Sequence, residues 1–151
     1  MNPVHLHAER AMAVPASVVY ACIANYVDHH RPGGFLPPAF ERLDILEGGQ
    51  GAGTVIRFVV RVGGTRQTTT QTVSEPEPGR ILVESDARVT TTFTVNPTST
   101  DSCLVQIDTL MTRSGGIIGI IEGLLIPRLL LPLYHDELAR LDARARQTNS
   151  P

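Results

Sequence analysis

The stretch IIGIIEGLLIPRLLLPLY, residues Ile117–Tyr134, decides how the rest of this chain can fold. It is almost long and apolar enough to cross a membrane, but it contains the charged residues Glu122 and Arg128 and the prolines Pro127 and Pro132. A spanning helix needs about 20 apolar residues, and a charge near the middle of a bilayer is costly. The stretch therefore predicts a buried or cavity-facing helix of a soluble protein, and no stable membrane span.

The predicted helix extends from about Gly116 to Ala145. Pro127 and Pro132 each remove a backbone hydrogen bond, which predicts a bend or a break between residues 123 and 132. In the second half the apolar positions narrow to a stripe at helical spacing, formed by Tyr134, Leu138, Leu141 and Ala145. The charged residues there are expected on the outer face: Asp136, Glu137, Arg140, Asp142 and Arg144. Residues 146–151 are expected to form a polar tail.

Before this helix the sequence alternates with a period of two. Short turns separate the alternating segments, a pattern typical of antiparallel hairpins. The predicted strands are Phe40–Glu47, Thr54–Val62, Arg66–Glu75, Arg80–Ser85, Val89–Asn96 and Ser102–Thr112. Val4, Leu6 and Ala8 predict an opening strand, and residues 15–26 a short amphipathic helix that begins at Pro15. Residues 28–38, rich in turn formers, are expected to be a loop or a broken second helix.

These elements predict an α+β fold. A seven-stranded curved antiparallel sheet wraps round the long C-terminal helix, with two short helices between strands 1 and 2, and residues 1–145 form a single domain. One helix cannot fill a sheet of that size, so we expect a cavity between the two. A helix that is apolar on all sides can line the core and the cavity at once.

The composition restricts the partners of this chain. Its 151 residues include 19% charged residues, carry a net charge of −2 and contain no lysine. This balance does not suit nucleic-acid binding, which uses a clustered basic surface, and it excludes Schiff-base chemistry. Cys22 and Cys103 form no disulfide framework, and residues 1–14 do not resemble a signal peptide, so we expect a reducing cytoplasm. His5 and His7 share a strand face without further ligands, so we expect no metal and no cofactor.

Several motifs mark hairpins and helix ends. They are A-x-x-V-Y-A after Pro15, F-L-P at residues 35–37, L-E-G-G-x-G-x-G-T at 46–54, E-P-E-P-G-R-I-L at 75–82, and G-L-L-I-P-R-L-L-L-P…L-A-R-L at 123–141. Through them, over residues 3–145, the chain resembles the polyketide cyclase/dehydrase and lipid-transport family of the START-like, helix-grip (SRPBCC) superfamily. The resemblance implies a hydrophobic cavity for a lipid, a polyketide, or a steroid-like or other aromatic molecule. Some members catalyse cyclisation or aromatisation, and many only bind.

The alternation along each strand predicts which side chains face the cavity. In Thr54–Val62 the apolar face with Phe58 and Val60 is expected inside, and Arg57 and Arg61 outside; an inward arginine pair that binds an acid is the alternative. In the next strand we expect Thr68, Thr70 and Thr72 inside rather than Gln67, Thr69 and Gln71, because glutamine prefers water. In Val89–Asn96 we expect Thr91, Phe93 and Val95 inside. In the last strand Val105, Ile107, Thr109 and Met111 oppose Leu104, Gln106, Asp108 and Leu110, and because neither face is purely apolar the sequence leaves open which of them lines the cavity. The expected ligand contacts are Tyr26, Phe35, Phe58, Val60, Thr70, Phe93, Ile107, Ile121, Leu125 and Leu129.

Three residues are candidates for acid–base catalysis: His29, His30 and Asp108. Imidazole titrates near neutral pH, and burial of a carboxyl in an apolar cavity raises its pKa. The alternative places both histidines in a solvated loop and Asp108 on the outer face. Glu122 either reaches solvent or faces the cavity. The glycine-rich residues 48–53 have the spacing of a nucleotide-binding loop, but a strand follows them, so they predict a hairpin.

The sequence leaves three functions open. The first is binding of a hydrophobic small molecule without catalysis, and the second is a cyclase, aromatase or dehydratase type of enzyme that uses the same cavity. The third is docking of Ile117–Leu133 on a membrane or a partner chain. A homodimer is compatible with each of them.

Overall fold

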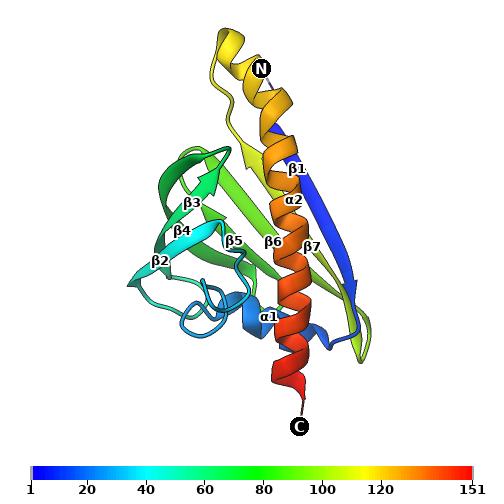
Figure 1. The fold of residues 1–151 in the computed structure, drawn as a ribbon. Coiled ribbons are helices and arrows are strands. Elements are labelled where there is room, and N and C mark those ends of the chain that lie inside the picture. Colours follow the sequence, from blue (N-terminus) through cyan, green and yellow to red (C-terminus); the bar gives the residue numbers. More distant parts are fainter. Residues whose placement is uncertain (1, 151) are drawn as a thin grey trace.

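A single antiparallel sheet carries the fold in the computed structural model, which describes residues 2–150. The elements are β1 (Val4–Met12), α1 (Ala16–Ala24), β2 (Phe40–Glu47), β3 (Val55–Val62), β4 (Thr65–Glu77), β5 (Ile81–Ser85), β6 (Val89–Ser99), β7 (Ser102–Met111) and α2 (Gly116–Asn149). The strand order is β1-β7-β6-β5-β4-β3-β2, so the sheet is a meander that β1 closes beside β7. The sheet curves round α2 (Figure 1), as the helix-grip prediction requires.

Short turns set the register of the hairpins. Gly63 and Gly64 join β3 to β4 with φ angles of 58° and 81°, a conformation that suits a two-residue hairpin and that glycine adopts at little cost. The glycine-rich residues 48–53 connect β2 to β3 and precede a strand, as predicted. Their backbone is fastened by Glu75, whose Oε1 accepts a hydrogen bond from the Ala52 N–H at 2.7 Å.

Only one helix lies between β1 and β2, so the expected second short helix is absent from this described part of the chain. The segment after α1 turns instead. The Asn25 side-chain oxygen accepts hydrogen bonds from the N–H groups of Val27 and Asp28, which favours a turn over a helix. Further on, a Cβ at Gly34 would meet the His29 carbonyl oxygen at 1.9 Å, so the loop closes on itself there.

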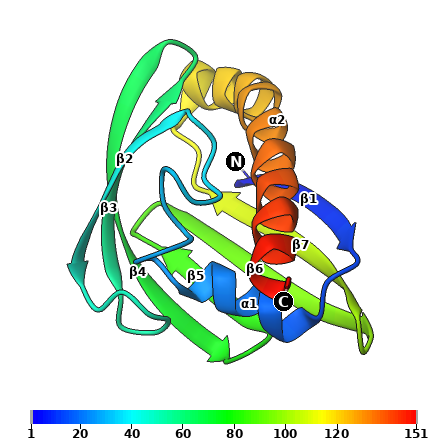
Figure 2. The same cartoon turned by 60° about the horizontal axis from the view of Figure 1, so that its bottom comes forward.

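The long helix α2 is continuous through Pro127 and Pro132, and it bends along its length without breaking (Figure 2). It also continues to Asn149, past the predicted end at Ala145. The side chain of Arg146 donates to Asp142 one turn earlier at 2.8 Å, so part of the polar segment expected to be a tail belongs to the helix.

The core lies between β1, β6, β7, α1 and the second half of α2. Leu6, Ile23, Val105, Leu138 and Leu141 are fully buried there. Among the described residues, α2 is the one helix long and apolar enough to cross a membrane, a test of length and composition that soluble core helices also pass. Its first half extends beyond the core over the sheet, and the candidate site lies under it.

Candidate functional site

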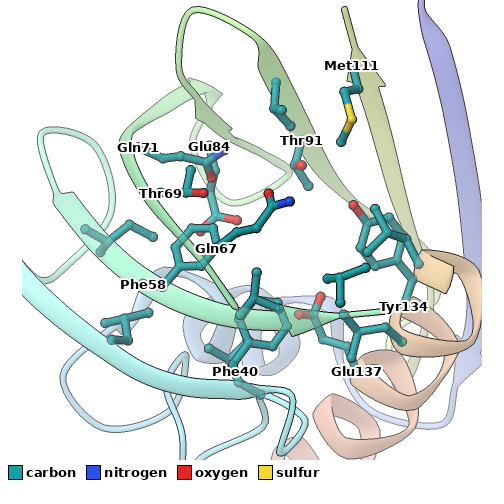
Figure 3. A pocket seen from close by; sticks show the side chains of 18 of the residues that line it. Phe40, Phe58, Gln67, Thr69, Gln71, Glu84, Thr91, Met111, Tyr134 and Glu137 are labelled. Atoms are coloured by element: carbon teal, nitrogen blue, oxygen red, sulfur yellow. The ribbon is translucent and has the colours of Figure 1, made fainter. Parts of the chain in front are cut away.

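A pocket of about 230 Å³ lies between the concave face of the sheet and the first half of α2 (Figure 3). The sheet and the helix both contribute to its wall. Much of that wall is apolar and includes Phe40, Leu43, Phe58, Val60, Phe93 and Ile126. Polar side chains enter at separate points, an arrangement typical of sites for small molecules.

Strand β3 turns its predicted face to the pocket. Phe58 and Val60 lie in the wall, while Arg57 and Arg61 are exposed on the other side and near Asp44 and Glu41 respectively. The alternative of an inward arginine pair is therefore wrong. Arg57 and Arg61 point away from the pocket, so they cannot bind an acidic ligand in it.

Strand β4 is turned the other way from the prediction. Gln67, Thr69 and Gln71 line the pocket, whereas Thr70 is exposed on the outer face. The cause is the register: Thr69 is the cross-strand partner of Phe58 and Gln71 that of Ile56, and directly opposed residues share a face of the sheet. The preference of glutamine for water therefore does not decide which side chains of β4 face the pocket. The pairing of β4 with β3 decides it.

The helical phase of α2 also differs from the prediction. Ile121, Leu125 and Leu129 are exposed and lie outside the pocket wall. The helix turns the neighbouring set inward, namely Glu122, Ile126, Leu130, Leu133, Tyr134 and Glu137. This set continues the stripe of Tyr134, Leu138, Leu141 and Ala145 backwards along the helix, and that stripe was the signal that could have found it.

Tyr26, Phe35 and Ile107 are buried, but they lie behind the pocket rather than in its wall. Tyr26 stacks on His30 with ring centroids 4.4 Å apart, and Phe35 packs against the same His30 ring with centroids 4.6 Å apart. Of the predicted contacts, Phe58, Val60 and Phe93 lie in the wall; their role toward a ligand stays a prediction.

His30 is buried in the wall of the pocket. Its Nδ1–H donates to the Ile23 carbonyl at 2.8 Å, which leaves Nε2 as the acceptor of a neutral ring. That Nε2 lies 3.8 Å from Oε2 of Glu84. Burial lowers the pKa of His30, although Glu84 acts in the opposite direction. A neutral His30 therefore offers the pocket a lone pair.

The other two catalytic candidates lie outside the pocket wall. Asp108 is on the outer face of the sheet, where the His7 ring contacts it at 2.7 Å and His5 at 3.3 Å. His29 accepts a hydrogen bond from Arg144 at 2.9 Å, which ties the loop after α1 to α2. The alternation of β7 turns Asp108 away from this pocket, and His29 also lies outside its wall, so neither residue is placed to act on a ligand there. A catalytic role for either residue stays a prediction. Among residues 2–150 no three His, Cys, Asp or Glu side chains gather to hold a metal ion.

Two buried carboxyls enter the pocket from opposite sides, Glu84 from β5 and Glu137 from α2 (Figure 3). Oε2 of Glu84 accepts a hydrogen bond from the Tyr26 hydroxyl at 2.8 Å. Glu137 is 4% exposed, although the sequence placed it on the outer face. Burial, together with the nearby charges of Glu84 and Asp136, raises its pKa to about 8. At neutral pH this carboxyl is mostly protonated and can exchange a proton with a ligand.

A chain of hydroxyls borders these carboxyls. The Tyr134 hydroxyl lies 2.7 Å from Oγ1 of Thr109, which lies 2.9 Å from Oγ1 of Thr91. Burial raises the pKa of Tyr134 to about 12, so this group stays a neutral hydroxyl. The chain joins β6, β7 and α2 and positions two polar side chains in the pocket wall, Thr91 and Tyr134.

At the other end of the pocket, Glu122 faces the cavity, one of its two predicted positions. It pairs with Arg88 and accepts a hydrogen bond from the Ser114 N–H at 2.7 Å. The pair fastens the beginning of α2 to the sheet.

Sequence reasoning missed Glu84 and Glu137, the most unusual residues of the site. Each carried a signal. Glu84 has the same parity as Leu82 in a short strand, so it shares the face of a buried leucine. Glu137 lies three residues after Tyr134 and four before Leu141, so it belongs to the buried face of the helix.

The comparisons with known proteins agree with this geometry. The family model described as polyketide cyclase / dehydrase and lipid transport matches residues 3–146. No curated protein matches the chain significantly. Among solved structures, the solution structure of KanY protein is similar with 27% identity and a TM-score of 0.81, covering 97% of this chain and 99% of that one.

Two enzymes share the fold at lower identity. The Zhui aromatase/cyclase from a Streptomyces species has 18% identity and a TM-score of 0.75 over 95% of this chain and 93% of that one. Norcoclaurine synthase from Thalictrum flavum, in complex with dopamine and hydroxybenzaldehyde, has 16% identity and a TM-score of 0.71 over 99% and 91%. At such identities the likeness establishes the fold alone.

Proposed function

Because the chain belongs to the polyketide cyclase/dehydrase and lipid-transport family, we propose that it binds a compact hydrophobic small molecule in the pocket between the sheet and α2. The observation that carries this function is the pocket itself, with a largely apolar wall into which polar groups project at separate points. Removal of apolar surface from water supplies affinity, and these polar groups supply selectivity.

The size of the pocket favours a compact aromatic ligand over a long-chain lipid. Its volume of about 230 Å³ is below the range of roughly 300–1,000 Å³ that drug-sized ligands occupy. Phe40 and Phe58, whose ring centroids are 5.6 Å apart, offer aromatic surface along one side. An aromatic ligand can stack on either ring or meet it edge to face.

The test is a binding titration with a neutral aromatic probe, naphthylethanol, measured by calorimetry. We expect Val60→Phe to fill the pocket and abolish binding. The matched control is Val59→Phe, one residue away on the opposite face of β3, and we expect it to bind as the unchanged protein does. Equal binding by both variants, or no binding by the unchanged protein, would remove the proposed function.

Catalysis has an observation of its own in its favour. A carboxyl with a pKa of about 8 inside an apolar pocket can give or take a proton near neutral pH, which is what an enzyme of the cyclase or aromatase type requires. In this alternative Glu137 replaces His29 and Asp108 as the acid–base candidate. The test follows the aldol cyclisation of a synthetic β-triketone by chromatography. We expect Glu137→Gln to lose about 100-fold in rate or more while it still binds naphthylethanol. If the unchanged protein converts the triketone no faster than the spontaneous reaction does, this alternative is removed.

Neither function needs a second domain, because the sheet and α2 together form the pocket. Residues 1–145 then act as one unit in the cytoplasm with a small molecule as partner. Docking of Ile117–Leu133 on a membrane or a partner chain, and a homodimer, stay predictions.

A further inference from the structure

One end of the pocket contains more hydrogen-bond acceptors than donors. We call it the acidic end and define it by Glu84, Glu137 and His30. Glu84 already accepts a hydrogen bond from the Tyr26 hydroxyl, and His30 donates its own N–H to the Ile23 carbonyl oxygen. What remains free there is carboxyl oxygen, the single O–H of protonated Glu137 and an imidazole lone pair, so acceptors outnumber donors. A ligand that fits this end must bring donors.

The carboxyl of Glu137 has no hydrogen-bond partner within residues 2–150. It is 4% exposed and lines the pocket, and no hydrogen bond reaches its carboxyl from any residue that the structure describes. A buried carboxyl is ordinarily hydrogen-bonded, because the loss of its hydration is otherwise uncompensated. Figure 3 shows the side chain directed into the cavity, where a ligand can supply the missing partner.

Among residues 2–150, no unpaired arginine lines the pocket to balance these acids. Arg88 is the one arginine among the described lining residues, and it is occupied by Glu122 and by the Thr112 carbonyl oxygen. Both of these contacts lie at the far end from Glu137 along α2. The electrostatic environment at the acidic end therefore favours a positive charge and opposes a negative one.

We propose that the pocket selects a compact hydrophobic molecule that carries a protonated amine, with the ammonium group held between Glu84 and Glu137. This inference rests on the proposed binding function and adds the charge of the ligand to it. An ammonium group brings three donors and no acceptor, which complements the acceptors of the acidic end. A carboxylate ligand of the same shape, such as a fatty or aromatic acid, is rejected.

Binding of such a ligand changes the protonation of Glu137. In the empty pocket its pKa of about 8 keeps the carboxyl mostly protonated at pH 7. Glu84 on β5 and Asp136 on α2 raise that pKa, and Tyr26 and Tyr134 lie close enough to be coupled to it. An adjacent ammonium favours the carboxylate, so the proton leaves Glu137 for the solvent when the amine binds. A neutral alcohol causes no such release.

The experiment compares three probes with the same ring and chain: naphthylethylamine, naphthylethanol and naphthylacetate. Calorimetry at pH 7 in two buffers of different ionisation enthalpy gives the affinity and the number of protons released. We expect the amine to bind about 10- to 100-fold more tightly than the alcohol, the range for a hydrogen bond to a charged group, and to release close to one proton. The acetate is expected to bind at least about 10-fold more weakly than the alcohol.

The variant Glu137→Gln keeps the shape of the side chain but cannot become negatively charged, so it tests the contribution of the charge alone. We expect it to weaken amine binding by about 10-fold or more, to abolish proton release, and to leave the alcohol within about 3-fold. The matched control is Glu47→Gln, an exposed residue of β2 outside the pocket, which is expected to change none of the three. The proton count of the unchanged protein needs no variant, so the test holds even if Glu137→Gln folds poorly.

The outcomes distinguish this inference from the proposed function. Equal affinities for the three probes, tightest binding of the acetate, or amine binding without proton release would each overturn the selection of an amine and leave the pocket as a binding site. Failure of all three probes to bind would overturn both.

Discussion

The two halves of α2 differ in burial, and the difference is the reverse of what their hydropathy predicts. In the first half, Gly116–Leu133, Ile117 is 75% exposed and Leu124 60%, although this is the most apolar stretch of the chain. In the second half, Tyr134–Asn149, Leu141 is fully buried and even the side chain of Asp142 is only 4% exposed. The more polar half is the one inside the protein.

The difference shows that burial follows the covering elements rather than the composition of the helix. β1 and α1 pack against the second half, whereas the first half projects over the open side of the sheet (Figures 1 and 2). In the first half of α2, one face of the helix lines the pocket and the apolar residues on the other faces are exposed. Glu137 lies near the boundary between these two environments, so it is both buried and close to the ligand space.

The largest expected effect comes from truncating one leucine in each half of α2, which tests directly whether the two halves differ in burial. Leu141→Ala leaves a cavity in the packed core, and we expect it to lower the free energy of unfolding by about 2–5 kcal/mol. Leu124→Ala removes the same atoms from an exposed position and is expected to change it by about 0.5 kcal/mol or less. Urea unfolding followed by circular dichroism measures both. Similar losses in the two variants would mean that the first half is also covered.

The pH dependence of stability tests the boundary residue. The pKa of Glu137 in the folded protein, about 8, lies above its ordinary value of 4.5, so the folded state binds more protons than the unfolded chain between those values. The free energy of unfolding therefore falls as pH rises from about 5 to about 8. We expect Glu137→Gln to remove about 1–3 kcal/mol of this decline and Glu47→Gln to keep it. Unfolding curves at several pH values measure the slopes, and parallel slopes for all three proteins would contradict the assignment.

The polar anchor of the second half can be removed without a large change in volume. Asp142 receives hydrogen bonds from Arg10 of β1 and from Arg146, each at 2.8 Å. Burial alone would raise the pKa of its carboxyl, but the two arginines outweigh it and the pKa lies below its ordinary value. We expect Asp142→Asn to cost about 1–3 kcal/mol at neutral pH.

Asp136→Asn is the control for this anchor. Its carboxylate pairs with Arg140 on the exposed side of the same helix, and such surface pairs contribute about 0–1 kcal/mol. Thermal unfolding ranks the two variants. A smaller loss for Asp142→Asn than for Asp136→Asn would show that the Arg10 contact does not hold α2 to β1.

The smallest effect is expected on the exposed face of the first half. The double change Ile118→Ser with Leu124→Ser removes two exposed apolar side chains, and we expect the stability of the monomer to stay within about 0.5 kcal/mol. Sedimentation velocity at several concentrations checks the same variant for association. A stability loss that grows with protein concentration would indicate that a second copy covers this face, which is the predicted homodimer.

The sequence predicted the strands well because alternation is a local property. The faces of β3 and β6 follow from their own residues, as Phe58 and Phe93 show, whereas β7 has apolar residues on both faces and its inner face stayed open. It failed for Thr70 because the face of β4 depends on the register with β3, a contact between strands. A mixed strand of threonines and glutamines has no apolar side from which to infer that register.

The helical phase failed for a different reason. A stretch that is apolar on every side contains no helical phase of its own, so only the stripe of the second half, extended backwards, distinguishes Ile126 from Leu125. Asp142 was expected outside because aspartate is seldom buried, and only the arrival of Arg10 from a distant strand makes its burial favourable. The acidic end of the pocket joins Glu84 of β5, Glu137 of α2 and His30 of the loop after α1. The burial of each carboxyl could be inferred within its own element, but their meeting is a contact between elements that no local pattern contains.

The three tyrosines of the chain each connect a helix or the loop after α1 to the sheet. The hydroxyl of Tyr20 in α1 donates to Glu75, that of Tyr26 to Glu84, and that of Tyr134 in α2 bonds with Thr109. Since the protein has no tryptophan, its near-ultraviolet spectrum comes largely from these rings. The molecule thus contains its own optical probes, and their absorbance can follow the separation of either helix from the sheet without any added label.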